Sequence, residues 1–302
     1  MKVIGIDVGG TGVKGAIVHR DGTFLHGEKV PTDISNGREG ILNTIFQVID
    51  ILMKKDGSIS GIGVGTAGRV DPEKGTVVYA TDNLPSWQGT QVREEIETRY
   101  GLPCAVDNDA NVALLGELWK WEGNPETAVM LTLGTGVGGA NALQGEVLHG
   151  HHHQSGEWGH VVLVPNGKPC NCGKKGCLEQ YLSGTALVQD VFTETNRMFP
   201  HGSEIFKEYS SGNQKVKLVV DRYLDYLAIA AYNISVSVDP EVLFIGGGII
   251  DSKDHWWAGF QVKLKEYFVN TSIYPAVLGN HAGMLGAAKL VFQAMEKRGE
   301  SV

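Results

Sequence analysis

One histidine and three cysteines have the types and spacing of a closed metal site. Cys170, Cys172 and Cys177 lie within eight residues, and His160 stands ten positions before the first of them. One nitrogen and three sulfur ligands complete a tetrahedral zinc site. The glycines of "CNCGKKGC" let the loop turn tightly enough for three thiolates to reach one ion. The surrounding stretch is too polar for a core segment, so unliganded buried thiols are disfavoured and zinc is predicted.

A histidine tract, "HGHHHQSGEWGH" from His149 to His160, precedes the cysteines. It lies mid-chain and is therefore not a purification tag. Only His160 has cysteines at ligand spacing. His151, His152 and His153 have no cysteine or carboxylate at a useful spacing, so a solvent-lined loop is predicted there in place of a second metal site.

The stretch "DVGGTGVK" combines the groups that bind a metal–nucleotide phosphate. The amides of Gly9 and Gly10 and the hydroxyl of Thr11 would bind phosphate oxygens, beside the cation of Lys14. Asp7 would hold Mg²⁺ through its water shell. An ordinary hairpin turn is the alternative, and the motif alone leaves both interpretations open.

A second acidic motif, "DNDAN" from Asp107 to Asn111, follows a short apolar strand. Transfer of a phosphoryl group to a hydroxyl needs a base beside that hydroxyl, and Asp109 is the natural candidate. Asn108 could orient the substrate. In the alternative interpretation, Asp109 only caps the helix that begins with "ANVALLGE".

These motifs need strands and helices to hold them, and the apolar periodicity predicts both. Strands are expected at 2–10, 13–22, 23–32, 58–68, 103–109, 127–136, 137–148 and 241–250. Helices are expected at 37–55, 110–121, 216–238 and 284–298. Strands and helices alternate without a low-complexity linker, which predicts an α/β protein.

The chain contains one internal repeat. "GTGVKGA" at Gly10–Ala16 and "GTGVGGA" at Gly134–Ala140 match at six of seven positions, and each follows an apolar strand. Chance similarity is possible in a glycine-rich chain, but two related domains that open with the same strand–turn–strand unit are the simpler explanation. Both copies also fit G-x-G-x-x-G. A dinucleotide fingerprint is rejected, because it needs a helix after the glycines and a strand follows each time.

Composition limits the function. The 302 residues are enough for one large or two medium domains, and 42% hydrophobic with 20% charged residues is ordinary for a globular protein. A net charge of −8 argues against nucleic-acid binding. No apolar run approaches bilayer length and no signal peptide is recognisable, so no membrane association and a cytoplasmic location are expected.

Taken together, "DVGGTGVK", "GVGTAGRVD", "NDAN", "LGTGVGGA", "GEWGH" and "CNCGKKGCLE" resemble the ROK family of bacterial sugar kinases and sugar-responsive repressors. The order is that of the family and covers essentially the whole chain. The combination of E-x-G-H with C-x-C-G-x-x-G-C-x-E is highly specific, whereas each glycine-rich piece alone is weak. The resemblance implies a two-domain actin/hexokinase-like (ribonuclease H-like) α/β fold with the sugar in an interdomain cleft. We expect a small domain at 1–116, completed by a C-terminal helix at about 285–302, and a large domain at 117–284 with the zinc site.

The resemblance also implies roles for individual residues. Asp109 would be the general base, and one nitrogen of His160 would bind a structural zinc while the other faces a sugar hydroxyl. The implied sugar contacts are Gly68, Asn83, Asn108, Asp109, Glu157, His160 and Glu179. The implied contacts of ATP and Mg²⁺ are Asp7, Gly9, Gly10, Thr11, Lys14, Gly134, Thr135, Gly136, Gly246, Gly247 and Gly248.

The expected activity is ATP-dependent phosphorylation of a hexose at its 6-hydroxyl, with glucose first and N-acetylmannosamine, N-acetylglucosamine, fructose or allose as alternatives. A homodimer or homotetramer is expected. The chain departs from the family on the sugar side, in its histidine triplet and in Ala67, where many relatives carry proline. The rival from another class, a sugar-sensing repressor, needs an upstream helix-turn-helix domain, for which the hairpin that begins at residue 3 leaves no room. An idle sugar-binding module is disfavoured by the presence of Asp109.

Overall fold

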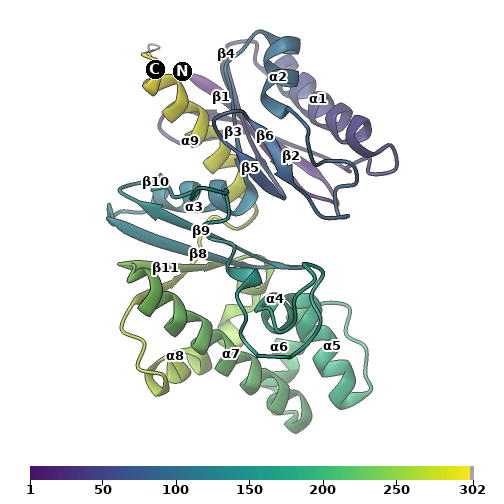
Figure 1. Cartoon of the computed structure of the whole chain (residues 1–302), viewed down its shortest axis with the longest axis vertical. Coiled ribbons are helices and arrows are strands. Elements are labelled where there is room, and N and C mark those ends of the chain that lie inside the picture. Colours follow the sequence, from purple (N-terminus) through teal and green to yellow (C-terminus); the bar gives the residue numbers. More distant parts are fainter. Residues whose placement is uncertain (300–302) are drawn as a thin grey trace. The chain divides into compact units, whose positions relative to one another are not determined.

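The computed structural model describes residues 1–299, which divide into two compact units (Figure 1). Unit 1 contains Met1–Asn124, the short segment His149–Gln154 and the residues from Asn280 onward. Unit 2 contains Pro125–Leu148 and Ser155–Gly279. We call His149–Gln154 the histidine strap, because the chain leaves unit 2 to place this segment in unit 1 and then returns. In the described part of the chain, no helix has both the length and the apolar character needed to cross a bilayer.

Unit 1 is built on a five-stranded sheet in the order β3-β2-β1-β4-β7. Its strands are β1 (Lys2–Val8), β2 (Val13–His19), β3 (Phe24–Val30), β4 (Ile59–Thr66) and β7 (Cys104–Asn108). The first three pair antiparallel, whereas β1, β4 and β7 run parallel. A small antiparallel pair, β5 (Arg69–Asp71) and β6 (Thr76–Tyr79), follows β4.

Helices cover both faces of this sheet (Figure 1). They are α1 (Gly37–Lys55) and α2 (Val92–Tyr100) on one face, and α3 (Asp109–Lys120) and α9 (Ala282–Lys297) on the other. Alternate residues of a strand point to opposite faces, so Ile4 and Ile6 of β1 join the apolar cluster with α1 while Gly5 meets α9. A Cβ atom at Gly5 would lie 1.9 Å from the carbonyl oxygen of Met284. Glycine therefore lets the backbone of α9 rest directly on the sheet.

Unit 2 repeats the same topology. Its sheet has the order β10-β9-β8-β11-β12, with β8 (Thr127–Leu133), β9 (Val137–Leu143), β10 (Glu146–Val147), β11 (Val242–Gly246) and β12 (Ser272–Pro275). Again the first three strands in sequence pair antiparallel and the others run parallel to the first. The two copies of the glycine repeat occupy the same hairpin of their respective sheets, which confirms that the two halves share one strand–turn–strand unit.

The helices of unit 2 pack around a separate core. They are α4 (Glu179–Leu182), α5 (Gly184–Thr195), α6 (Gly202–Ser210), α7 (Gln214–Val238) and α8 (Trp257–Glu266), with 3₁₀ turns at Trp158–His160 and Gly248–His255. A further 3₁₀ turn, Gly279–His281, contains the division of the chain at 279/280. Phe206, Phe244, Trp256 and Phe260 are fully buried in or beside this core. The long helix α7 contains the whole of the expected 216–238 segment and begins two residues earlier.

The unit boundaries lie elsewhere than we expected from the sequence. The expected divisions at 116/117 and 284/285 both fall inside helices, α3 and α9, whereas the units divide at 124/125 and 279/280. The reason is the packing of these two helices on each other. A Cβ atom at Gly286 would lie 1.5 Å from the carbonyl oxygen of Val112, so α3 and α9 belong to one unit along their length. The expected helix at about 285–302 begins at Ala282, and residues 300–302 lie outside the described part.

Candidate functional site

The expected residues of unit 1 gather where three parallel strands end. β1, β4 and β7 run in the same direction, so their carboxyl ends share one edge of the sheet. Asp7 lies near the end of β1, Gly68 follows β4 by two residues, and Asn108 is the last residue of β7. This edge is where open α/β sheets bind their ligands.

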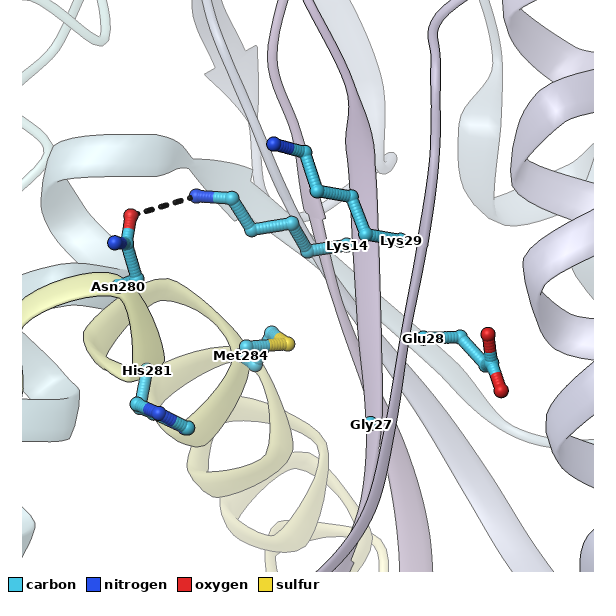
Figure 2. A pocket seen from close by; sticks show the side chains of 7 residues that line it. All are labelled: Lys14, Gly27, Glu28, Lys29, Asn280, His281 and Met284. Atoms are coloured by element: carbon cyan, nitrogen blue, oxygen red, sulfur yellow. Dashed lines mark hydrogen bonds between the residues drawn. The ribbon is translucent and has the colours of Figure 1, made fainter.

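The turn between β1 and β2 is closed by a hydrogen bond from the amide of Gly9 to the carbonyl oxygen of Gly12, at 3.1 Å. Lys14, two residues into the turn's second strand, points back toward Asp7, with 3.4 Å between its Nζ and Asp7 Oδ2. The same Nζ donates a hydrogen bond to Asn280 Oδ1 at 3.2 Å, just before α9 (Figure 2). Lys14 therefore connects the turn to the start of α9.

A second lysine lies beside Lys14. Lys29 of β3 is paired with Lys14 in the sheet register, and both line an open pocket of about 400 Å³ (Figure 2). Gly27, Glu28, Asn280, His281 and Met284 complete the lining. The positive side chains of Lys14 and Lys29 are thus paired on β2 and β3, the two strands that come after the glycine turn.

Asp7 is held in an environment that favours a nearby cation. Burial is the dominant influence and raises the pKa of its carboxyl group, although the charge and hydrogen bond of Lys14 act in the opposite direction. A Cβ atom at Gly283 would lie 2.8 Å from Asp7 Cγ, so this glycine lets the first turn of α9 come close to the carboxylate. Because burial disfavours the ionised form of this half-buried carboxyl group, a divalent cation or its hydration shell nearby would stabilise it.

The "DNDAN" motif forms the turn from β7 into α3, and its residues Asn108 and Asp109 have different positions. Asn108 is the helix cap: its side-chain oxygen accepts hydrogen bonds from the amides of Ala110 at 2.8 Å and Asn111 at 3.2 Å. Its side-chain nitrogen donates to the carbonyl oxygen of Gly68 at 2.8 Å. The capping role that the sequence assigned to Asp109 as an alternative therefore belongs to Asn108.

Asp109 is the first residue of α3. Its carboxylate accepts a hydrogen bond from the amide of Ala110 at 2.9 Å. Asn83 lies close to the glycine turn between β1 and β2, because a Cβ atom at Gly10 would be 2.9 Å from the carbonyl oxygen of Asn83. Unit 1 thus brings its expected sugar and nucleotide residues to one edge, with Thr11 exposed on the turn.

In unit 2, the four expected metal ligands form a cluster. The ligand atoms of His160, Cys170, Cys172 and Cys177 all lie within 4.8 Å of one another. His160 Nδ1 is 3.8 Å from Cys170 Sγ, and the sulfurs of Cys172 and Cys177 are 3.5 Å apart. Such separations match the edges of a tetrahedron whose centre lies roughly 2.0–2.3 Å from nitrogen and sulfur ligands.

The chemistry of this donor set also fits a cation. Burial and then the neighbouring sulfurs of Cys172 and Cys170 raise the pKa of Cys177 to about 12, so several thiolates need a positive ion between them. Gln180 donates a hydrogen bond from Nε2 to Cys170 Sγ at 3.7 Å. The residues therefore fit a metal ion of the zinc type.

The other side of His160 carries an acid. While Nδ1 faces the sulfurs, Nε2 lies 4.0 Å from Glu157 Oε2. Glu179, at the start of α4, accepts a hydrogen bond from the amide of Val137 at 3.0 Å through Oε2. A Cβ atom at Gly136 would lie 2.5 Å from that oxygen. The metal cluster, the two acids and the second glycine turn are thus neighbours within unit 2.

The two glycine turns of unit 2 are also adjacent. The amide of Gly134 donates to the carbonyl oxygen of Gly136 at 3.0 Å, and the amide of Gly184 at the start of α5 donates to the carbonyl oxygen of Gly134 at 2.7 Å. Thr185 Oγ1 donates a hydrogen bond to the carbonyl oxygen of Thr135 at 2.9 Å. Gly247 has a φ of 84°, and a Cβ atom there would meet the Leu133 backbone at 2.4 Å. Only glycine brings the 246–248 turn this close to the end of β8.

Sequence reasoning missed the partners of the histidine tract. His149 Nε2 lies 2.7 Å from Asp107 Oδ2, and His153 Nε2 lies 4.0 Å from Asp71 Oδ2. These carboxylates are distant in sequence, so local spacing gave no sign of them. His151 and His152 are exposed, as expected for a solvent-lined loop, whereas His153 is half-buried. Gln180 and Asn280 also had no sequence signal beyond their place beside a motif or a helix start.

Comparison with known proteins identifies the family. The profile described as "ROK family" matches residues 3–294. The chain is 32% identical to a glucokinase of Halalkalibacterium halodurans over 99% of this chain and 98% of that protein. The chain belongs to the ROK family.

Solved structures of ROK proteins have the same fold. A ROK hexokinase of Thermus thermophilus matches with a TM-score of 0.86 at 30% identity, over 98% of this chain and all of that one. A ROK glucokinase of Streptomyces griseus, solved in complex with glucose and AMPPNP, matches with a TM-score of 0.83 at 29% identity, over 97% and 100% of the two chains. The actin/hexokinase-like fold class predicted from the sequence is confirmed.

Proposed function

We propose that this ROK protein transfers the γ-phosphoryl group of ATP to the 6-hydroxyl group of a hexose, and that glucose is the first candidate. The observation that carries the proposal lies within unit 1. The turn that bears Asp109 and the glycine turn that bears Asp7 and Lys14 occupy one edge of the same sheet. Relatives of nearly full length that are named glucokinase support the activity class, a sugar kinase.

Asp109 is proposed as the general base. Its carboxylate accepts the proton of the 6-hydroxyl as the hydroxyl oxygen forms a bond to the γ-phosphorus. The bond between that phosphorus and the bridging oxygen of ADP breaks, and the electron pair leaves with ADP. Asn108 holds the turn through Gly68 and the first amides of α3, which keeps the base in a fixed position.

Mg²⁺ and ATP are proposed to bind through the glycine turns. Asp7 would hold the hydrated cation, while the amides of Gly9 and Gly10, Thr11 and Lys14 would contact phosphate oxygens. In unit 2 the turns at 134–136 and 246–248 would contact the phosphates and the adenosine, respectively. AMPPNP in the Streptomyces griseus glucokinase supports ATP as the donor.

The cluster of His160, Cys170, Cys172 and Cys177 is proposed to bind zinc. A zinc ion held by four protein ligands would supply structural cross-linking and would leave no open position for chemistry. With Nδ1 committed to the cluster, His160 would present Nε2 to a sugar hydroxyl, together with Glu157 and Glu179. Three reduced cysteines suit the cytoplasm, the proposed location.

A coupled ATP-consumption assay against a panel of sugars tests the proposal. The panel contains glucose, N-acetylmannosamine, N-acetylglucosamine, fructose and allose, because the histidine triplet and Ala67 lie on the side assigned to the sugar. We expect turnover with at least one hexose and a 6-phosphate product by NMR. Turnover with none of them, together with sugar binding by calorimetry, would instead support a sugar-binding module or the sensing domain of a repressor. Light scattering would test the proposed homodimer or homotetramer.

A further inference from the structure

A buried carboxylate stands two residues before the proposed base. The side chain of Asp107, in β7, has 0% exposure. An ionised carboxylate in such a place is strongly unfavourable unless hydrogen bonds and a positive partner compensate it. The hydrogen bonds of Asp107 therefore show which parts of the structure depend on it.

Asp107 joins the histidine strap to the turn that begins α3. Its Oδ1 accepts hydrogen bonds from the amide of Asn108 at 2.7 Å and from Asn111 Nδ2 at 2.8 Å. Its Oδ2 lies 2.7 Å from His149 Nε2. One oxygen thus fixes the residues on either side of Asp109, and the other contacts His149. All of these residues belong to unit 1.

The two charges stabilise each other. Burial is the largest influence on His149 and would lower its pKa, as would the charge of Lys297. The hydrogen bond and negative charge of Asp107 outweigh both, so the pKa of His149 lies above its ordinary value. The protonated imidazole is therefore the positive partner that the buried carboxylate requires.

We propose that His149 is a positioning residue for phosphoryl transfer: through Asp107 it fixes the turn that presents Asn108 and Asp109. The inference rests on the proposed function, in which Asp109 is the base. His149 contacts Asp107, and the proposed mechanism gives it no contact with the substrates. A displacement of about 1 Å at a reacting group costs on the order of 100-fold in rate, so loosening this turn lowers kcat.

The pairing predicts a pH dependence with a definite sign. Asp107 and Lys297 are the charged groups that act on His149. Because the folded-state pKa of His149 is raised, the contribution of its protonated form is fully present below the ordinary pKa of histidine. That contribution is lost as the pH rises through the raised value. We therefore expect kcat to fall on the alkaline side, and we expect this limb to disappear in Asp107→Asn.

Three variants test the role of His149 in the full chain. His149→Leu is expected to lower kcat by roughly 10- to 100-fold, with the KM of sugar and ATP within about three-fold of wild type. His201→Leu is the matched control, because His201 is an exposed histidine just before α6 and has no part in the proposed site. The double variant His149→Leu with Asp107→Asn is expected to regain at least about five-fold over His149→Leu. The amide carries no charge to bury and its oxygen still accepts from Asn108 and Asn111.

A kcat of His149→Leu within about two-fold of the control, or a double variant no faster than His149→Leu, would overturn the proposal. If His149→Leu does not fold, the pH profile of Asp107→Asn decides, and an unchanged alkaline limb overturns it. NMR titration of the His149 ring separates this inference from the proposed function. If the wild type has no kinase activity, the proposed function is wrong. A fall in the pKa of His149 in the Asp107→Asn variant would still support the pairing of His149 with Asp107. An unchanged His149 pKa contradicts the pair.

Discussion

At the scale of single residues, neighbouring residues of the "DNDAN" motif have different roles. Asn108 caps α3 and donates a hydrogen bond to Gly68, the side chain of Asp107 is fully buried, and Asp109 is the first residue of the helix. The sequence left two roles open for Asp109, helix cap or general base. The structure assigns the cap to Asn108. That assignment agrees with the proposed role of Asp109 as the general base.

Asp109→Asn is expected to lower kcat by at least ~100-fold, because general-base catalysis contributes roughly 10²–10⁴-fold. The asparagine oxygen can still accept from the amide of Ala110, so thermal unfolding and sugar affinity by calorimetry should remain close to wild type. Asp254→Asn, which changes an exposed carboxylate of unit 2, is the control. An Asp109→Asn enzyme within a few-fold of wild type would remove Asp109 from the role of base.

At the scale of elements, the sequence predicted those strands, helices and turns that depend on the pattern of neighbouring residues. The strands that carry Asp7 and Asn108, the helix α7 and the shared hairpins all follow from apolar periodicity and glycine turns. The metal cluster was predictable because its ligands lie within eighteen residues, from 160 to 177. The pair of His149 and Asp107 was not, because their contact depends on where the strap lies in unit 1. The unit boundaries were missed for a similar reason, since the α3–α9 packing joins distant segments.

The metal loop predicts a measurable ion. Metal analysis of the purified protein should give about one zinc per chain. Cys172→Ser should lose this zinc, lower the unfolding temperature and weaken sugar binding, because His160 would no longer be held. Replacement of His151, His152 and His153 together should leave the zinc content unchanged. A loss of zinc in that triple variant would show that the strap, and not the cysteine loop, binds the metal.

Contact of α9 with the sheet gives a test of packing. A Cβ atom at Gly63 would lie 1.7 Å from the carbonyl oxygen of Ala287, which is backbone and cannot move aside alone. Gly63→Ala should therefore lower the free energy of unfolding by ~1–3 kcal/mol or more, as overpacked sites do. Gly57→Ala is the control, because a Cβ atom at Gly57 would have no atom within 4 Å apart from its chain neighbours. This substitution should be nearly neutral or stabilising. Equal denaturant midpoints for the two variants would contradict this packing.

At the scale of the whole molecule, the residues proposed for each ligand are divided between the two units. Asp109 and Asn108 belong to unit 1, whereas Glu157, His160 and Glu179 belong to unit 2. The proposed nucleotide contacts are divided in the same way, between the turn at 7–14 and the turns at 134–136 and 246–248. Neither unit alone carries all the residues proposed for either ligand, so the proposed function predicts that the two ligands bind cooperatively.

The sugar should therefore strengthen nucleotide binding. Calorimetry with a non-hydrolysable ATP analogue and Mg²⁺, with and without saturating sugar, measures this coupling directly. The affinity for the analogue should rise in the presence of sugar, and the analogue must raise the affinity for the sugar by the same factor, because linkage between two binding sites is reciprocal. His201→Leu, at an exposed histidine outside the proposed site, should retain the coupling, whereas Cys172→Ser should reduce it by releasing His160. Identical nucleotide affinity in the two wild-type titrations would mean that the units bind their ligands independently.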